Sequence, residues 1–307
     1  MDDRWQLARW VRSADDGVVT ITPIRDVDRD ESSRIMTAAR VVATMTGNKL
    51  IKPLVDATNV LGQVAGHVLE RPGMRANDAE LRSTWSAALD VWLMHVVMMR
   101  RRTEREVGRL LGDAAHRHAR DVFEALYRTD PDFRLAWEWR NIAQHDMDPL
   151  ELTRVTVGVG EDSAPQVRWV IDPEAAGRQH QFGNEVCASR VVETPECYDV
   201  IAAVVRSMEA ALSKIVLFAE DTIADAAGLI FARVGEVLNT VDPRERDGNR
   251  QVSAVVASLG SPESILYAPL RYDLAAHALL TLDAARESVG LPRVHTPPPD
   301  EHTGAPD

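Results

Sequence analysis

The chain has 307 residues, of which 45% are hydrophobic and 5% aromatic, and its formal net charge is −12. This length and apolar share suit one large globular domain or two smaller ones and exclude a disordered chain. The low aromatic content favours helix packing over a β sandwich. A net charge this negative excludes a general basic surface for nucleic acid, so any RNA or DNA contact must be local.

The two cysteines, Cys187 and Cys197, are too few for a disulfide framework or a zinc site. The opening residues MDDRWQLARW carry charges from the second position and lack the apolar core of a signal peptide. No run reaches the roughly 20 apolar residues that a membrane-spanning helix needs. We therefore predict a soluble, cytoplasmic protein without membrane contact, and we expect no cofactor and no metal.

The first 30 residues are expected to form an amphipathic helical turn or two, followed by a short strand at GVVTITPI (17–24). Residues 31–70 show helical spacing on both sides of GNKLIKP (47–53), which predicts a helical hairpin that breaks there. Residues 31–150 are expected to form one helical bundle.

The interval between Pro72 and Pro131 contains no proline and predicts a long helix, because proline is costly inside helices. Apolar residues at i, i+3, i+4 spacing mark the buried face of this helix: Trp85, Ala88, Leu89, Trp92, Val96, Met99. We expect the helix to bend near RRRTERE (100–106) or at Gly112. Arg100 falls on the same side as Trp92 and Val96. Either its stem packs while its head reaches water, or it faces a bound ligand.

The segment FRLAWEWRNIAQHD (133–146) carries the candidate site. On a helix through 135–145, one arc forms a buried stripe: Leu135, Ala136, Trp139, Ile142, Ala143. The opposite arc holds the candidate binding residues Trp137 and Gln144 together with Arg140, Asn141 and His145. A large aromatic here needs a cover, yet these polar groups cannot enter an ordinary core. A second copy packed across a two-fold axis meets both demands and would bring Arg140 near the partner's His145.

After Pro149 the hydrophobic period changes to two. Thr153, Val155 and Val157 alternate on one arm, and Val167, Trp169 and Ile171 on the other, which predicts a β-hairpin over 151–172. Residues 173–290 are expected to form a C-terminal helical region packed on the bundle, with helices near 196–240, 249–259 and 264–289. The proline-rich tail 291–307 is expected to be disordered. The predicted fold is mainly α: a helical bundle with one β-hairpin after the motif helix.

The sequence RNIAQH (140–145) resembles the R-x4-H motif of HEPN domains, in which a polar residue follows the arginine. Its place at the end of a helix, after a long helix, is also similar, and the resemblance covers roughly residues 78–150. It implies a helical bundle that dimerises through the motif, and for many members a metal-independent ribonuclease acting as a toxin or in phage defence. Arg140, Asn141 and His145 would then be catalytic, RNA the substrate, and an antitoxin or defence protein the partner.

Histidine and arginine side chains have the chemical properties that metal-independent RNA cleavage requires. Histidine titrates near neutrality and can transfer the protons, whereas arginine is always charged and its fork suits phosphate oxygens. Two alternatives stay open. The same helix face could bind a nucleotide, RNA or a protein without catalysis, or it could be a solvated or packing face without chemistry.

Other candidates have simpler explanations. His116 and His118 are two positions apart and point to different helix sides, so they cannot share a metal. His95 suits a packed histidine. Glu220, Asp221 and Asp225 suit surface charge, since no Glu-x-x-His motif accompanies them. GVGEDS (158–163) lacks the lysine of a phosphate loop and suits a hairpin turn.

Overall fold

The computed structural model describes residues 4–12, 18–46, 49–70, 79–145, 148–159, 165–183, 185–241, 251–261 and 264–295. These residues are mainly helical, with a small antiparallel sheet and a separate hairpin. The chain divides into two compact units. The sheet unit comprises Met1–Lys49, Arg109–Gly112 and Val216–Asp307, and the helical unit comprises Leu50–Gly108 and Asp113–Ile215.

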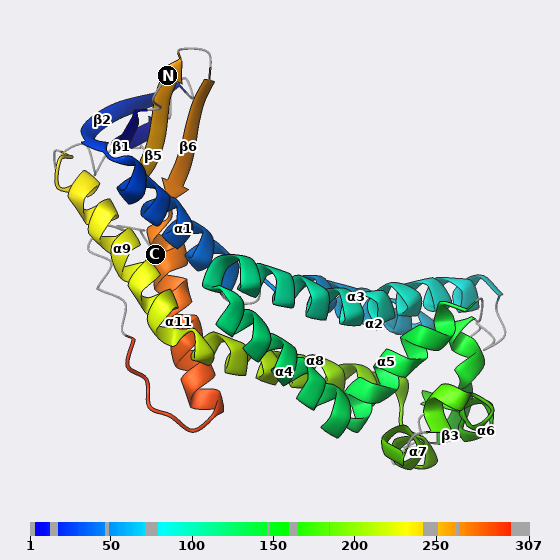
Figure 1. The fold of residues 1–307 in the computed structure, drawn as a ribbon. Helices are drawn as coiled ribbons and strands as arrows, with labels where there is room; N and C mark the ends of the chain where they lie inside the picture. The colour runs from blue at the N-terminus through cyan, green and yellow to red at the C-terminus, as the bar shows by residue number, and fades with distance from the viewer. Residues whose placement is uncertain are drawn as a thin grey trace. The chain divides into compact units, whose positions relative to one another are not determined.

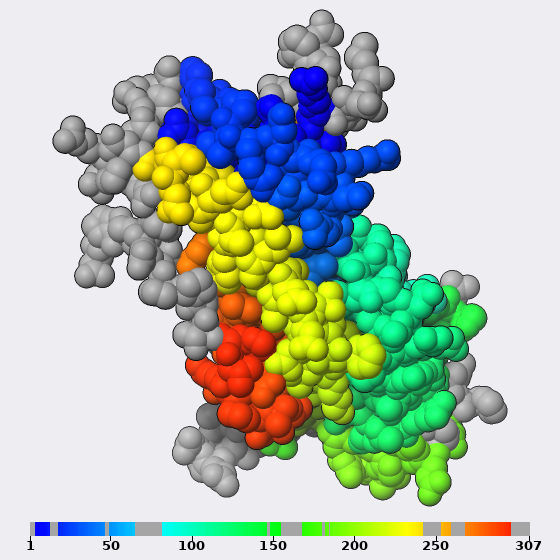
Figure 2. Space-filling view, turned by 60° about the vertical axis from the view of Figure 1, so that its left-hand side comes forward, coloured from blue at the N-terminus to red at the C-terminus, as the bar shows by residue number. Residues whose placement is uncertain are grey.

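The sheet unit holds a four-stranded antiparallel sheet in the order β2-β1-β5-β6. Its strands are β1 (Trp5–Arg12), β2 (Val19–Val27), β5 (Gln251–Ser261) and β6 (Ser264–Leu270). Among the described residues, three helices accompany it: α1 (Arg29–Met45), α9 (Glu220–Leu238) and α11 (Tyr272–Ser288). Figure 1 shows these elements, and in Figure 2 helix α9 lies between α1 and α11. Helices α1 and α9 contact the sheet.

The sheet buries apolar side chains on both faces. Leu7 of β1 lies opposite Val256 of β5, and both are fully buried. Because side chains alternate along a strand, their neighbours point to the other face. There they form a small cluster of Ala8, Val255 and Ala257, against which Trp10 and Ile21 pack.

This sheet corrects the predicted fold in three places. The first residues, predicted to form helical turns, are strand β1. The predicted helix over 249–259 is strand β5, and the predicted helix over 264–289 begins only at Tyr272 because strand β6 precedes it. Strand β5 is covered on both faces and so lacks the polar alternation that marks a half-buried strand. The strand predicted at 17–24 is confirmed as β2.

The helical unit is built mainly from helices and includes most of the 33-residue α3. Its longer helices are α2 (Lys52–Glu70), α3 (Ala79–Leu111), α4 (Asp113–Thr129), α5 (Pro131–Ala143) and α8 (Cys197–Phe218). Shorter elements are η1 (Pro149–Leu152), α6 (Pro173–Gly177), η2 (His180–Gly183) and α7 (Glu185–Val192). The predicted break in 31–70 is confirmed, but it separates α1 of the sheet unit from α2 of the helical unit. Gly112, with a φ of 85°, separates α3 from α4 as one of the two predicted bends.

The predicted hairpin is confirmed as β3 (Thr153–Val159) and β4 (Pro165–Ile171). Thr153 pairs with Ile171, Val155 with Trp169 and Val157 with Val167. The Trp169 ring lies 4.7 Å from that of Trp85 on α3, measured between centroids. Trp85 also contacts Tyr198 of α8, so aromatic stacking holds the hairpin on the helices. Of the predicted turn GVGEDS, residues 160–163 lie outside the described residues.

The start of the predicted disordered tail is bound to the sheet unit. The carboxylate of Asp283 accepts hydrogen bonds from the backbone N–H groups of Val294 and His295, at 2.9 and 3.0 Å. The His295 ring lies 2.7 Å from Glu220, which also accepts a bond from Arg286. The prediction of disorder is therefore wrong for 291–295, whereas 296–307 lie outside the described residues.

Candidate functional site

The motif RNIAQH straddles the end of α5. The helix begins at an Asp130 cap, whose carboxylate accepts a hydrogen bond from the Phe133 N–H at 2.8 Å. It ends at Ala143, and the His145 N–H bonds to the Ile142 carbonyl in a tighter turn. The predicted helix through 145 is therefore too long. Arg140 and Asn141 lie in the last turn, whereas Gln144 and His145 follow it.

The buried stripe of α5 fixes how the motif is held. Leu135, Ala136, Trp139 and Ile142 are buried as predicted, and Ala143 is half-buried. The indole N–H of Trp139 donates to the Pro149 carbonyl at 2.9 Å. This bond fastens the chain that leaves the motif back onto the helix.

Trp137 is covered by its own chain. Its ring lies 5.8 Å from that of Tyr127 on α4 and 6.0 Å from that of Phe133, between centroids. The guanidinium carbon of Arg100 lies 5.4 Å from the ring centroid, within the range of a cation–π contact. A second copy is therefore not needed to cover Trp137, contrary to the expectation from the helix pattern.

Arg100 is engaged in ion pairs, so its head does not reach water freely. Its Nε donates to Glu104 at 2.8 Å and a terminal nitrogen donates to Glu124 at 2.6 Å, and only 14% of the side chain is exposed. Burial alone would lower the pKa of Arg100, but the bonds to Glu124 and Glu104 outweigh it and raise the pKa. These contacts give Arg100 a structural role beside Trp137.

A chain of hydrogen bonds leads from α4 to Arg140. The Tyr127 hydroxyl donates to one carboxylate oxygen of Glu138, a residue that is only 7% exposed. The other oxygen accepts from the Asn141 amide at 3.0 Å. The Asn141 carbonyl in turn accepts from Arg140 at 3.4 Å. Asn141 is therefore oriented by a buried carboxylate and presents its carbonyl to Arg140.

The environment of Tyr127 keeps its hydroxyl protonated. Burial, followed by the bond to Glu138 and the charge of that carboxylate, raises the pKa of Tyr127 to about 12. The guanidinium of Arg134 lies 4.0 Å from the Tyr127 ring and 3.5 Å from Glu138. The donor that holds Glu138 is thus present at all ordinary pH values.

Arg140 carries a positive charge that no described carboxylate neutralises. Its one hydrogen bond to a described residue is the bond to Asn141, and its Nε is buried without a partner. Burial and, after it, the charge of Arg101 lower the pKa of Arg140, while Asp90 acts in the opposite direction. A guanidinium that is partly desolvated and not paired is suited to an anion such as phosphate.

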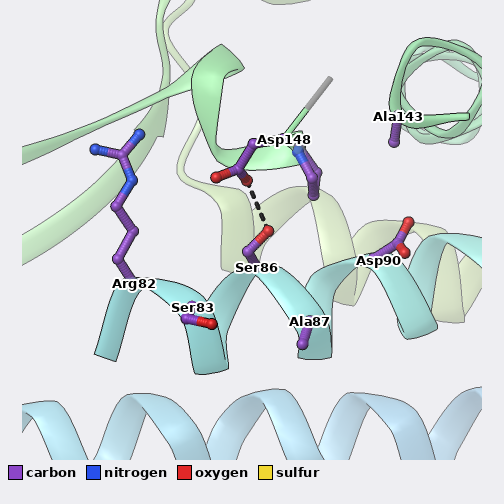
Figure 3. A pocket seen from close by; sticks show the side chains of 8 residues that line it. Arg82, Ser83, Ser86, Ala87, Asp90, Ala143 and Asp148 are labelled. Atoms are coloured by element: carbon purple, nitrogen blue, oxygen red, sulfur yellow. Dashed lines mark hydrogen bonds between the residues drawn. The ribbon is translucent and has the colours of Figure 1, made fainter. Parts of the chain in front are cut away.

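A pocket of about 470 Å³ adjoins the motif between α3 and the end of α5 (Figure 3). Its lining includes Ala143 of the motif and Asp90, the acidic residue that also acts on Arg140. The Ser86 hydroxyl donates to Asp148 at 2.6 Å, and the same oxygen of Asp148 caps η1 through the Leu150 N–H. In Figure 3 these two side chains point toward each other. The pocket lining is completed by Arg82, Ser83, Ala87 and Pro149.

The structure brings some predicted site residues together and leaves others apart. Arg140 is bonded to Asn141, and Arg100 contacts Trp137. Gln144 and His145 are exposed after the helix end, and their side chains make no hydrogen bond to a described residue. Sequence reasoning missed Glu138, Tyr127 and Asp90. The signal for Glu138 was its position three residues before Asn141, on the same helix face.

Metal-binding groups, membrane-spanning helices and similarity to known proteins were each searched for in this chain. In the described part of the chain, no three His, Cys, Asp or Glu side chains are grouped so that they could hold a metal ion. None of the described helices has the length and apolarity to span a membrane. The chain matches no protein-family model, no curated protein and no solved structure.

Proposed function

We propose that this protein is a HEPN-like, metal-independent endoribonuclease, with Arg140, Asn141 and His145 at its active site and a second copy completing the cleft. The observation that carries the proposal is Arg140: its guanidinium is oriented by Asn141, yet it has no carboxylate partner among the described residues. Such a cation suits the charge that develops on a phosphate during cleavage. The exposed His145 lies close by in sequence and is free to reach a bound strand.

The reaction assigns one role to each group. A histidine takes the proton of a ribose 2′-hydroxyl, and the 2′-oxygen forms a bond to the adjacent phosphorus. The bond from phosphorus to the 5′-oxygen of the next nucleotide breaks, and that oxygen takes a proton from the second histidine of the dimer. Arg140 stabilises the charge on the non-bridging oxygens. The products are a 2′,3′-cyclic phosphate and a 5′-hydroxyl.

A second function is favoured by the surroundings of His145. No described residue holds its imidazole in one orientation, whereas a general base normally has an orienting partner. Arg140 and the adjoining pocket would then bind a nucleotide or an RNA strand without cutting it.

The test is cleavage of a labelled RNA pool in EDTA by the wild type, His145→Ala and Arg140→Ala. We expect cleavage by the wild type, with cyclic phosphate ends, and a loss of at least about 100-fold in each variant, since general acid–base catalysis and oxyanion stabilisation each supply that much. His277→Ala is the matched control, because His277 is exposed on α11 and its side chain makes no bond to a described residue.

Two results would separate the alternatives. If the wild type cuts nothing but binds a non-cleavable RNA, and Arg140→Ala loses that binding, the site is a binding site. If neither cleavage nor binding occurs, or if His145→Ala cleaves like the wild type, the ribonuclease proposal is refuted.

A further inference from the structure

The pocket between α3 and the end of α5 has the size of a small-molecule site. Its volume of about 470 Å³ lies within the range of ligand pockets. Apolar side chains form part of its wall: Ala87, Ala143 and Pro149. Polar side chains form the rest: Arg82, Ser83, Ser86, Asp90 and Asp148 (Figure 3). A flat ring with apolar faces and a polar edge, such as a nucleobase, suits this lining.

The part of the pocket around Asp148 offers hydrogen-bond acceptors. The Ser86 hydroxyl gives its hydrogen to one carboxylate oxygen of Asp148, and the Leu150 N–H donates to the same oxygen. The other oxygen of Asp148 makes no hydrogen bond to a described residue. Ala143 is the last residue of α5, and the C-terminal end of a helix carries a partial negative charge. A ligand that binds here must therefore bring donors.

Asp90 is the free carboxylate of this pocket. It is exposed, and it forms no hydrogen bond or ion pair with a described residue. Arg82 also lines the pocket, but it lies eight residues earlier on α3, which is about 12 Å along the helix axis. Both carboxylate oxygens of Asp90 are therefore available to a ligand.

Arg140 lies next to the end of the pocket that holds Asp90. It precedes Ala143 by three residues on α5, and Ala143 lines the pocket. Burial and the charge of Arg101 lower the pKa of Arg140, whereas Asp90 opposes them, so the Asp90 carboxylate lies within electrostatic reach of the guanidinium. A nucleotide carries a phosphate and a base on one ribose. A phosphate on Arg140 would therefore bring its base to Asp90.

Two free carboxylate oxygens select one of the four RNA bases. A carboxylate accepts two parallel hydrogen bonds from neighbouring N–H groups. Guanine has two such groups on its Watson–Crick edge, the ring N1–H and the exocyclic amino group. Adenine and cytosine place their amino group beside a ring nitrogen whose lone pair would face the carboxylate, and uracil has a single N–H between two carbonyls. Proteins read single-stranded RNA through this edge.

We infer that the pocket between α3 and the end of α5 is a guanine-recognition subsite, in which Asp90 accepts both N–H groups of a guanine whose phosphate binds Arg140. The inference rests on the proposed function, because Arg140 must hold a phosphate. It deepens that function by naming the substrate: single-stranded RNA with a guanine at the cleavage site.

The first experiment measures binding of nucleoside 3′,5′-bisphosphates to the full chain by isothermal titration calorimetry in EDTA. The guanosine, adenosine, cytidine and uridine compounds are compared, and each carries a phosphate on both sides of its ribose. We expect the guanosine compound to bind at least about tenfold more tightly than the other three, as is usual for a bidentate contact to a base.

Asp90→Asn tests the residue that reads the base. An asparagine amide offers one acceptor and one donor, which match the edge of adenine or cytosine and not that of guanine. We expect the guanosine compound to lose at least about tenfold in affinity and the adenosine or cytidine compound to become preferred. Arg140→Ala should instead weaken all four compounds alike, because it removes the phosphate contact.

Asp121→Asn is the matched control. Asp121 is likewise exposed and forms no hydrogen bond or ion pair with a described residue, but it lies on α4 beside a different pocket. Its change should leave the guanine preference intact. Circular dichroism of each variant verifies folding, which Asp90→Asn should not disturb because no described bond is lost.

Equal affinity for the four compounds, no binding of any of them, or a guanine preference that persists in Asp90→Asn overturns the inference. Its failure is distinguishable from failure of the proposed function. RNA cleavage that depends on His145 but shows no preference for guanine refutes the subsite alone. Binding of the guanosine compound that depends on Asp90, without any RNA cleavage, refutes the ribonuclease alone.

Discussion

Glu138 is the residue on which the order of the site depends. It is buried, it accepts hydrogen bonds from Tyr127 and Asn141, and it forms an ion pair with Arg134. A buried carboxylate that loses a donor keeps its desolvation cost. The network therefore couples the stability of the α4–α5 pair to the orientation of Asn141.

Tyr127→Phe removes one donor from this carboxylate. We expect the free energy of unfolding to fall by about 1–3 kcal/mol, the usual cost of leaving a buried charged acceptor unsatisfied. Tyr198→Phe is the control and should cost less, since its hydroxyl makes only a 3.4 Å contact with the Leu61 carbonyl. Denaturant unfolding gives both values, and equal losses would contradict the special role of Glu138.

The hydrogen bond from Tyr127 to Glu138 also predicts how the free energy of unfolding changes with pH. The pKa of Tyr127 is about 12 in the folded chain and 10.0 ordinarily, so the contribution is complete below pH 10.0 and is lost as the pH rises toward 12. The difference in unfolding free energy between the wild type and Tyr127→Phe should stay constant from neutrality to that point and then shrink. A difference that already shrinks below pH 10.0 would contradict the assignment of this pH dependence to Tyr127.

The sequence predicts which residues of a helix are buried when apolar residues recur on one face. It does not predict which residues of other helices they contact. The buried stripe of α5 follows from spacing alone. The contacts of Arg100 and Trp137 do not, because they join α3, α4 and α5 across positions far apart in sequence. The hydrogen bond between Arg140 and Asn141 could be predicted from their adjacent positions. The hydrogen bonds from Tyr127 and Asn141 to Glu138 could not be predicted in this way.

Among the helices, the break between α3 and α4 depends on one backbone conformation. Gly112 has a φ of 85°, which side-chain-bearing residues seldom adopt. Gly112→Ala should lower the free energy of unfolding by about 1–2 kcal/mol. Gly62 is the matched control: it is exposed within α2 and an added methyl group would meet nothing within 4 Å. Gly62→Ala should raise stability by about 0.5–1 kcal/mol, because alanine favours a helix.

Thermal or chemical unfolding of both variants decides the point. A stable Gly112→Ala would mean that the break can be bridged by a continuous helix. If Gly62→Ala lowers the free energy of unfolding as well, the loss in Gly112→Ala could not be attributed to the backbone conformation of Gly112.

The elements that sequence predicted correctly are those with a clear period. The β3–β4 hairpin alternates cleanly and its register follows. Strands β1 and β5 were missed because each is a central strand that pairs with a segment at the other end of the chain. In β5 the run Ala254–Ala257 is buried throughout, so its pattern cannot distinguish a buried strand from a buried helix.

At the scale of the whole molecule, the net charge of −12 limits how RNA can be held. If two Arg140 residues provide the phosphate contacts, the slope of log affinity against log salt should be about −1.4, from about −0.7 for each contact to a single strand. Fluorescence anisotropy with a 2′-O-methyl RNA, which cannot be cleaved, gives this slope.

A steeper slope would show that other cations take part, for example the exposed arginines along α4, Arg117, Arg120 and Arg128. Arg140→Ala should flatten the slope, whereas His277→Ala should not change it. A slope that Arg140→Ala leaves unchanged would place the RNA elsewhere on the protein.

The pairing of β1 with β5 also dictates an order of events during synthesis. Trp5 of β1 pairs with Ser258 of β5. Strand β1 therefore cannot pair with β5 until most of the chain has been synthesised. Until then the β1–β2 hairpin has an open edge that can pair with other chains. The residues of the helical unit are complete earlier, at Ile215. A chain that stops between these two points would carry a finished helical unit and an unpaired strand, and aggregation would begin at that strand.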